Sequence, residues 1–310
     1  MTNIQNWWVD TDPGVDDAWA ILMMMAAPNI RIDGISVVGG NVGIEHTLTN
    51  TCRIVDRSPY PIPVFAGAGR PMIGGLPDAG FVHGADGMGE AVLPIALTQP
   101  QAMIGALALI DAAKRHPQQL NVLALGPLTN IALALMLDPD LPTRCKRFVV
   151  MGGAVGARGN TRVPSGEFNI AFDPEAAAIV FARWPGMELL DWELTLEVAP
   201  SLQEVEDWLS RDSDNARWLH QITRSTAAFV RALDVEGWAW ADPLAAFAAI
   251  EPDGIQEWVE APIEIALALG PTRGQTVVDW HGIGGFAGPK VRIARKLAKE
   301  RFHLAMRAVL

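Results

Sequence analysis

Four aspartates lie within eight residues near the start of the chain, in the run DTDPGVDD: Asp10, Asp12, Asp16 and Asp17. Carboxylates at this density repel one another, and they ionise together only in water or around a cation. Pro13-Gly14 predicts a tight turn that would fold the acids toward one point. Because oxygen ligands select a hard metal ion, the run predicts a Ca²⁺ or Mg²⁺ site. The alternative is an acidic N-terminus of the helix that follows.

The spacing of this run can be compared with three known types of site. An EF-hand loop that starts at Asp10 requires Gly at its sixth position and Glu at its twelfth, where this chain has Val15 and Ile21. A dinucleotide-binding or P-loop site requires a glycine-rich turn in place of the acids. A haloacid-dehalogenase-like phosphatase also places Asp-x-Asp after its first strand. A metal-dependent phosphatase that uses Asp10 and Asp12 therefore stays open as an alternative.

The elements that must position these acids alternate between short strands and helices in the first half of the chain. The sequence predicts strands at 7–9, 32–38, 63–65, 120–125 and 147–151, and helices at 18–26, 47–55, 103–115, 130–137 and 173–183, the last with Asp173 as N-cap. This rhythm predicts an α/β fold with a mostly parallel, Rossmann-like open sheet and helices on both faces. Ligands bind at the carboxyl ends of such strands, so the loops of interest are 10–17, 39–41, 83–90, 126–130 and 152–169.

The second half of the chain is more helical. Helical patterns cover 202–233 with an interruption near 212–215, and Asp242-Pro243 starts another helix. The segments 263–268 and 276–280 predict late antiparallel strands. The last segment, 289–310, predicts a strand and then a basic amphipathic helix with a solvated face. Because no linker interrupts the pattern, we expect one domain over residues 1–310.

The composition excludes several classes of function. The chain of 310 residues has 35 acidic and 24 basic side chains, a formal net charge of −11, and half of its residues are hydrophobic. Binding to nucleic acid or to an anionic membrane requires clustered Lys and Arg, so neither is expected. The apolar run 18–27 has about half the length of a membrane span. The two cysteines, Cys52 and Cys145, and the absence of Lys and Arg from Met1–Val9 predict a cytoplasmic protein.

The acidic run and a series of further motifs resemble the nucleoside hydrolases, the inosine–uridine-preferring group of nucleoside N-ribohydrolases. The matches occur in order over nearly the whole chain: DTDPGVDDAWA at 10–20, VVGGN at 37–41, HGADG at 83–87, LGPLTN at 125–130, VMGG at 150–153, GN at 159–160, EFN at 167–169, DPEAA at 173–177, DP at 242–243 and TRGQTVVD at 272–279. One such motif alone is short, but the ordered set is specific to this family.

The resemblance implies calcium-dependent hydrolysis of the N-glycosidic bond of ribonucleosides to ribose and free base. It implies that Ca²⁺ is bound by Asp12, Asp17, Asp242 and the backbone carbonyl of Thr129, and that Asp12 is the general base that activates water. It implies a second set that contacts the ribose, with Asp10 supporting the cluster from behind: Asp16, Asn41, Met151, Asn160, Glu167, Asn169 and Asp242. Many acids suit this reaction, because cleavage builds positive charge on the ribose in an oxocarbenium-like state. Taken singly, the asparagines are also typical of turns, and Glu167 is typical of a solvent-facing loop.

The chain departs from the family pattern just before Asp242. Many members have a histidine there, which is thought to protonate the leaving base, and some have a stacking tryptophan, whereas this chain has Ala241. His83 could supply the acid, or it could pack or cap a loop. Trp238 and Trp240 could sandwich the base, or they could belong to the core. The nearby aromatic residues and the missing histidine favour a purine over a pyrimidine nucleoside.

The alanine at position 241 leaves another alternative, a calcium-dependent protein that binds nucleosides or ribose with little catalysis. The intact Asp12 argues against this alternative, since binding alone requires no water-activating base. The family resemblance also implies a homodimer or homotetramer. The expected partners are therefore a small nucleoside substrate and other copies of the chain.

Overall fold

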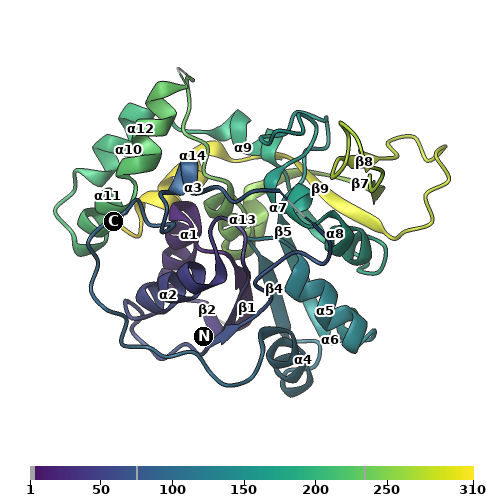
Figure 1. Ribbon diagram of the computed structural model, residues 1–310, viewed down its shortest axis with the longest axis horizontal. Coiled ribbons are helices and arrows are strands. Elements are labelled where there is room, and N and C mark those ends of the chain that lie inside the picture. The colour runs from purple at the N-terminus through teal and green to yellow at the C-terminus, as the bar shows by residue number, and fades with distance from the viewer. Residues whose placement is uncertain (1–3, 75, 234) are drawn as a thin grey trace.

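The sheet that carries the predicted site runs through the whole molecule. The computed structural model describes residues 4–74, 76–233 and 235–310, so the first three residues of the segment Met1–Val9 lie outside it. The strands are β1 (Gln5–Thr11), β2 (Ile30–Val37), β3 (Val64–Ala66), β4 (Leu120–Ala124), β5 (Cys145–Met151), β6 (Glu188–Leu190), β7 (Ile255–Ile265), β8 (Thr276–Val278) and β9 (Lys290–Leu297). They form one sheet in the order β3-β2-β1-β4-β5-β6-β9-β7-β8 (Figure 1).

The pairing confirms the predicted fold class. Seven neighbouring strands, from β3 to β9, are parallel, while β7 is antiparallel to both β9 and β8. The chain enters the sheet at β1 and then builds outward on both sides, first to β2 and β3 and later to β4 and β5. The carboxyl ends of β1 and β4 therefore flank a topological switch point, where open α/β sheets bind their ligands.

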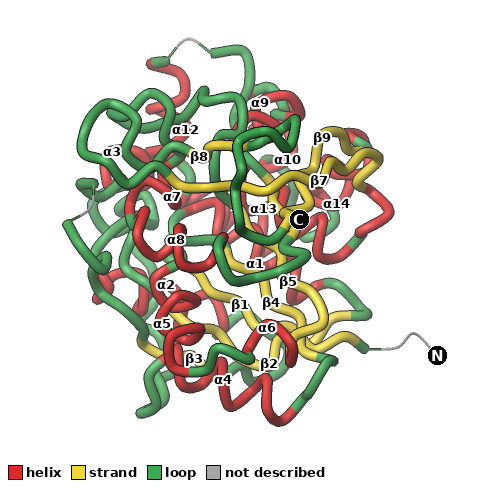
Figure 2. Tube along the Cα trace, turned by 90° about the vertical axis from the view of Figure 1, so that its right-hand side faces the viewer, coloured by secondary structure: helices red, strands yellow, loops and turns green. Residues whose placement is uncertain are grey.

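The helices cover both faces of the sheet, as Figures 1 and 2 show. Their bounds are α1 (Val15–Ala26), α2 (Ile44–Val55), α3 (Gly80–His83), α4 (Gly105–Arg115), α5 (Thr129–Leu137), α6 (Leu141–Arg144), α7 (Phe168–Phe172), α8 (Pro174–Phe181), α9 (Trp192–Val198), α10 (Leu202–Leu209), α11 (Asp214–Ile222), α12 (Arg224–Ala232), α13 (Ala241–Ile250) and α14 (Lys299–Arg307), with a 3-10 turn at Pro252–Gly254. No helix in the described ranges is both long and apolar enough to cross a membrane.

Two hydrophobic cores lie on opposite faces of the sheet. In β1, the side chains of Trp7 and Val9 enter the core beneath α1 and α13, while Trp8 enters the core beneath α4, α5 and α8. In β5, Val149 and Val150 divide in the same way. This alternation follows from the two-residue period of a strand. It explains why buried parallel strands have continuous apolar runs.

The structure differs from the sequence-based prediction at several elements. Helix α1 begins at Val15 instead of residue 18, so Asp16 and Asp17 lie in its first turn and Asp10 lies in β1; the four acids do not share one loop. The prediction omitted β6 and α9, because both are very short. It also started β7 too late, because bulges around Glu257 interrupt the alternation there.

Candidate active site

Asp17 holds together the turn that follows β1. Its Oδ2 accepts a hydrogen bond from the backbone N–H of Gly14 at 2.9 Å, and its Oδ1 accepts from the Asp12 backbone N–H at 3.3 Å and from the Thr11 hydroxyl. An acid that reaches back to the residue before the helix satisfies otherwise free N–H groups at the helix start. The acidic N-terminus that we considered as an alternative to a metal site is therefore present, and the same carboxylate faces the site.

Asp12 lies between two glycine backbones at the switch point. A Cβ at Gly40 or at Gly126 would overlap the Asp12 carboxylate, so both positions require glycine. The backbone N–H of Asn41 donates to Asp12 Oδ2 at 2.7 Å, while Oδ1 is buried and has no hydrogen-bond partner. A buried oxygen without a partner is costly unless a ligand satisfies it.

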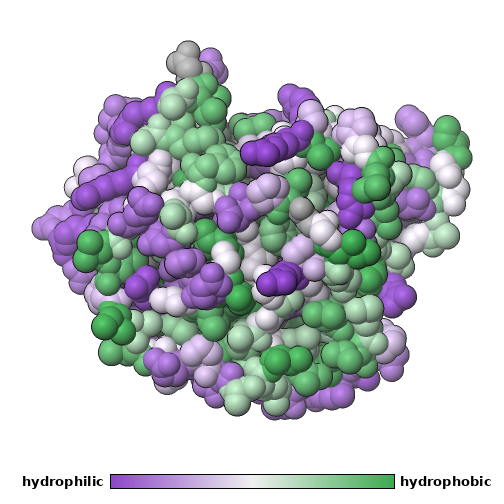
Figure 3. All heavy atoms as spheres, viewed as in Figure 1, coloured by the Kyte–Doolittle hydropathy of each residue, from purple (hydrophilic) through white to green (hydrophobic). Residues whose placement is uncertain are grey.

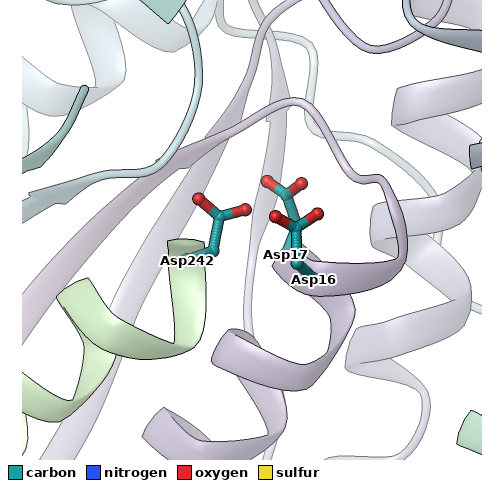
Figure 4. A group of neighbouring side chains, drawn as sticks. All are labelled: Asp16, Asp17 and Asp242. Carbon is teal, nitrogen blue, oxygen red and sulfur yellow. The ribbon is translucent and has the colours of Figure 1, made fainter. Parts of the chain in front are cut away.

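Three carboxylates from two helices meet beside Asp12. One carboxylate oxygen each of Asp16, Asp17 and Asp242 lies within 4.8 Å of the others. Figure 4 shows Asp242 at the start of α13 facing the two acids in the first turn of α1. We call Asp12, Asp16, Asp17 and Asp242 the carboxylate floor.

Asp10 lies beneath the carboxylate floor and is fully buried. Its Oδ2 accepts hydrogen bonds from the Ser36 hydroxyl and from Asn130 Nδ2, the latter at 2.9 Å. Burial raises the pKa of Asp10 to about 7, although these two hydrogen bonds oppose the shift. A phosphatase nucleophile must reach its substrate, so this position argues against the phosphatase alternative and agrees with a supporting role.

The electrostatics of the carboxylate floor call for a cation. Burial, followed by repulsion from neighbouring acids, raises the pKa of Asp12 and Asp242 well above the ordinary value, and burial raises the pKa of Asp16 to about 6. In the described ranges, the ion pairs of Lys and Arg all involve acids elsewhere. Buried oxygens of Asp10, Asp12 and Asp16 have no hydrogen-bond partner. Oxygen-only donors with unsatisfied lone pairs fit a hard divalent ion.

Glu167 is a buried residue of the loop that leads into α7. It is 2% exposed, and it accepts hydrogen bonds from the backbone N–H groups of Gly153 at 2.8 Å, Asn169 at 2.9 Å and Ile170 at 3.2 Å. The positive φ of Gly153, 79°, aims its N–H at this carboxylate. Burial raises the pKa of Glu167 to about 7. A solvent-facing loop acid, the simpler explanation from sequence, is therefore wrong.

The two asparagines of this region differ in their environment. Asn169 is buried, and its Nδ2 donates to the Leu125 carbonyl at 2.6 Å and lies 3.3 Å from Met151 Sδ, so it connects the ends of β4 and β5. Asn160 is exposed, and its Oδ1 accepts from the Phe168 backbone N–H at 2.9 Å, which is the turn chemistry expected from its residue type. Both asparagines still line the same cavity.

Thr129 begins α5 at the carboxyl end of β4 and is 2% exposed. Its hydroxyl donates to Asp173 Oδ2 at 2.7 Å. Metal binding by its backbone carbonyl stays a prediction.

His83 ends α3 and faces the start of α1. Its Nδ1 accepts the backbone N–H of Val15 at 3.3 Å and lies 3.9 Å from Asp16 Oδ1. Burial lowers the pKa of His83 to about 4, although the charge of Asp17 opposes this shift. At neutral pH the ring is therefore neutral, with its proton on Nε2 because Nδ1 accepts a hydrogen bond.

The structure excludes a base sandwiched between Trp238 and Trp240. Their ring centroids are 4.7 Å apart with an interplanar angle of 33°, so the two rings contact each other directly. Trp240 also packs edge-on against Trp19 at 4.6 Å and is 1% exposed. Core packing therefore describes both tryptophans, although both also line the wall of the cavity.

A cavity of about 600 Å³ joins these groups. It brings together most of the predicted residues, namely Asp16, Asn41, His83, Met151, Asn160, Glu167, Asn169, Trp240 and Asp242. Asp12, Asp17 and Thr129 are not part of its lining.

The outer part of the cavity is apolar, and sequence reasoning missed it. We call Phe81, Leu196, Phe229, Leu233 and Val235 the apolar rim; all five line the cavity, and all except Phe229 are at least 45% exposed. Phe81 of α3 and Phe229 of α12 meet edge-to-face at 5.7 Å. The only sequence signal was the amphipathic pattern of α12, which also suits a helix that packs on a core.

Comparison with known proteins agrees with this site. A family described as inosine-uridine preferring nucleoside hydrolase matches residues 7–304. A protein from Oryza sativa subsp. japonica named probable uridine nucleosidase 2 is 36% identical over 249 residues, which cover 79% of this chain and 74% of that protein. The non-specific ribonucleoside hydrolase RihC of Salmonella newport (strain SL254) is 42% identical over 182 residues, which cover 59% of this chain and 58% of that protein.

Solved structures show the same relationship over the full length. An inosine-guanosine nucleoside hydrolase and a plant nucleoside hydrolase, the PpNRh1 enzyme, each superpose with a TM-score of 0.91 at 28% identity, covering 98% of both chains. These matches exclude a phosphatase. They also favour a hydrolase over a protein that only binds nucleosides, because binding alone does not require the buried acid Asp12. The chain therefore belongs to the nucleoside hydrolase family, as a hydrolase that cleaves ribonucleosides into ribose and a free base.

Proposed function

We propose that this ribonucleoside hydrolase is calcium-dependent and that Asp12, Asp17, Asp242 and the backbone carbonyl of Thr129 hold the ion. The observation that carries the proposal is the carboxylate floor: three buried acids and the half-buried Asp16, with no Lys or Arg partner among the described residues. Ca²⁺ accepts six to eight oxygen ligands, more readily than Mg²⁺ does in a site made of protein carboxylates. When bound, the ion would orient the ribose diol and lower the pKa of a water ligand.

Asp12 is the general base in this proposal. It takes a proton from the attacking water while the water oxygen bonds to C1′ of the ribose. The C1′–N bond breaks, its electron pair leaves with the base, and the base takes up a proton from solvent. The unpartnered Oδ1 of Asp12 supports this role, because its lone pair is free to accept that proton. The remaining acids stabilise the positive charge on the ribose.

The ribose is held by side chains that differ in burial and in donor type. We assign its hydroxyl contacts to Asp16, Asn41, Asn160, Glu167, Asn169 and Asp242, and its apolar contact to Met151. Asn169 and Glu167 are preorganised, since each already makes hydrogen bonds that fix its orientation. Groups fixed before binding lower the entropic cost of reaching the reactive geometry.

His83 is the candidate group for contact with the leaving base. Its lowered pKa argues against proton donation from a charged imidazolium at neutral pH. The neutral ring with hydrogen on Nε2 could instead donate a hydrogen bond to the departing base. His83→Ala should therefore lower kcat if this contact forms, and a rate equal to that of the unaltered enzyme would remove His83 from the mechanism.

A purine is the proposed base over a pyrimidine. The cavity of about 600 Å³ and its aromatic lining, including Phe168, Trp192 and Trp238, favour the larger ring system. The names of the relatives point both ways, since the rice protein is named a uridine nucleosidase and a structural neighbour an inosine-guanosine hydrolase.

We further propose one domain over residues 1–310, a cytoplasmic location and a homodimer or homotetramer. Free Cys52 and Cys145 fit a reducing compartment. Figure 3 shows apolar side chains gathered over α4 and α5, where Leu107, Met136 and Leu137 are 44%, 47% and 60% exposed. Such a patch is typical of subunit contacts, and light scattering of the purified chain would test the assembly.

A ribonucleoside panel tests the proposed function. Inosine, guanosine, adenosine, uridine and cytidine are incubated with the enzyme, and free base and reducing sugar are measured with calcium, with chelator, and after calcium is restored. We expect release that is lost with chelator, restored by calcium and greater for the purines. Activity that survives chelation would refute the calcium requirement. The variant Asp111→Asn, at an exposed position outside the cavity, is treated in the same way and should behave as the unaltered enzyme does.

A further inference from the structure

Asp173 does more than cap its own helix. The N-cap of α8 requires one bond, and Asp173 Oδ1 accepts it from the Ala176 backbone N–H at 3.1 Å. The second oxygen, Oδ2, accepts from the Thr129 hydroxyl at 2.7 Å and from the Met72 backbone N–H at 2.9 Å. Asp173 is completely buried, so its carboxylate joins α8, α5 and the 67–74 loop in a site without competing water.

The Thr129-Asn130 pair is anchored from two sides. Thr129 is tied to Asp173, while Asn130 Nδ2 donates to Asp10 Oδ2 at 2.9 Å and Asn130 Oδ1 accepts from the Ala68 backbone N–H at 2.8 Å. Both residues are at most 2% exposed. Two side chains held on different partners leave the peptide unit between them little freedom to rotate.

The same peptide unit lies three residues after Gly126, which is next to Asp12. The backbone N–H of Leu125 donates to the Asp10 carbonyl at 2.8 Å, and a Cβ at Gly126 would overlap the Asp12 carboxylate. A backbone carbonyl has no side-chain torsion with which to adjust to an ion. Its position follows from the backbone around it, and bonds that anchor the neighbouring side chains help to hold that backbone in place.

We propose that Asp173 is a positioning residue of the calcium site: through the Thr129 hydroxyl it fixes the Thr129 backbone carbonyl toward the carboxylate floor. The inference rests on the proposed calcium site. In this inference, Asp173 affects the affinity for calcium although its carboxylate is buried outside the cavity and does not contact the ion. A purely structural brace between α5 and α8 would instead affect folding stability alone.

Thr129→Val separates these two roles. Valine keeps the shape and the backbone carbonyl of Thr129 but removes the hydroxyl donor to Asp173. Thr129→Ser retains the hydroxyl. Asp173→Asn changes the acceptor, and the double variant reports whether the two residues act through one bond. Thr51→Val is the matched control, since its buried hydroxyl bonds only within α2, to the Thr47 carbonyl at 2.8 Å.

The experiment measures the calcium Kd of the full-length chain by titration calorimetry and its Tm with and without excess chelator. We expect Thr129→Val and Asp173→Asn to weaken calcium binding about tenfold, with a smaller calcium-induced rise in Tm. Thr129→Ser and Thr51→Val should bind within about threefold of the unaltered chain, and the double variant should be no weaker than the weaker single variant. If Asp173→Asn does not fold, Thr129→Val carries the test.

Two outcomes would overturn the inference in distinguishable ways. If Thr129→Val lowers Tm equally with calcium and with chelator while Kd stays within twofold, Asp173 is a structural brace and the calcium site stands. If the unaltered chain binds no calcium, the proposed calcium dependence fails and the positioning role fails with it.

Discussion

The two ends of the cavity are built in opposite ways. The carboxylate floor lies at the carboxyl ends of β1 and β4 and at the starts of α1 and α13; all of its acids except the half-buried Asp16 are buried, and two of them have an oxygen without a hydrogen-bond partner. The apolar rim comes from α3, α9, α12 and the segment that follows α12; Phe81 is 71% exposed and Leu233 is 52% exposed. Charge that costs free energy to bury is concentrated at one end, and exposed apolar surface at the other.

This contrast separates two tasks of the enzyme. In the proposed function, the floor, whose acids lie at a strand end and at helix starts, faces the ribose carbon that becomes positive. In the same proposal, the rim lies on the side of the leaving base and offers mostly apolar contact, which binds substrate and transition state about equally. Changes in the floor should therefore affect kcat, and changes in the rim should affect KM.

The largest expected effect follows from Asp12→Asn. Asparagine can still accept the Asn41 backbone N–H but cannot take a proton from water, so kcat should fall by about 10³-fold or more, with KM within a few-fold. Steady-state kinetics with inosine measure both constants. Asp111→Asn, at an exposed position of α4, should leave both unchanged. A kcat within tenfold of the unaltered enzyme would remove Asp12 from its role and with it the contrast between floor and rim.

The floor could be predicted from sequence much better than the rim. The run from Asp10 to Asp17 is local, and the β–loop–α pattern around it predicts that its acids meet at a sheet edge. Asp242 came only from family resemblance, because nothing local to it indicates that α13 packs beside α1. The helix start at Val15 was missed, since Asp17 bonding back to Gly14 is a contact that residue types alone do not specify.

The rim and the second bond of Asp173 could not be predicted, for a physical reason. Phe81 and Phe229 belong to separate helices, and only the tertiary fold brings their rings together. Trp238 and Trp240 were ambiguous because core and cavity wall require the same apolar residue types. Asp173 was predicted as an N-cap, which is correct, but its second bond to Thr129 depends on how α5 and α8 pack.

The pH dependence of the free energy of unfolding shows how the fold accommodates Glu167, a buried acid without a nearby cation. Burial raises its pKa from 4.5 to about 7, so the folded protein keeps a proton that the unfolded chain has lost between these values. The stability from this proton is complete below about pH 4.5 and is lost as the pH rises through about 7. Glu167→Gln does not titrate. The free energy of unfolding of the unaltered chain relative to this variant should therefore fall from pH 5 to pH 8, by at most about 3 kcal/mol.

Urea unfolding of the unaltered chain and of Glu167→Gln, in chelator at pH 5, 6.5 and 8, measures this difference. The acids of the floor are the same in both proteins, so their contribution to the pH dependence cancels. Asp111→Asn gives the baseline for an exposed acid. A difference that is flat or rises with pH would show that the three backbone N–H groups around Glu167 outweigh its burial. Glu167 would then be charged at neutral pH without help from a cation, unlike the floor.

The smallest expected effect belongs to Phe81→Ala in the rim. Removing the ring deletes apolar contact with Phe229 and with a base in the cavity, worth about 1 kcal/mol for a ring this exposed, or roughly a fivefold rise in KM. Because this contact does not grow stronger as the glycosidic bond breaks, kcat should stay within about twofold. Leu269→Ala, an exposed apolar residue on the β7–β8 loop, should change neither constant. A fall in kcat with unchanged KM would instead mean that α3 orders His83 for the chemical step, so that the rim and the floor do not divide binding from catalysis.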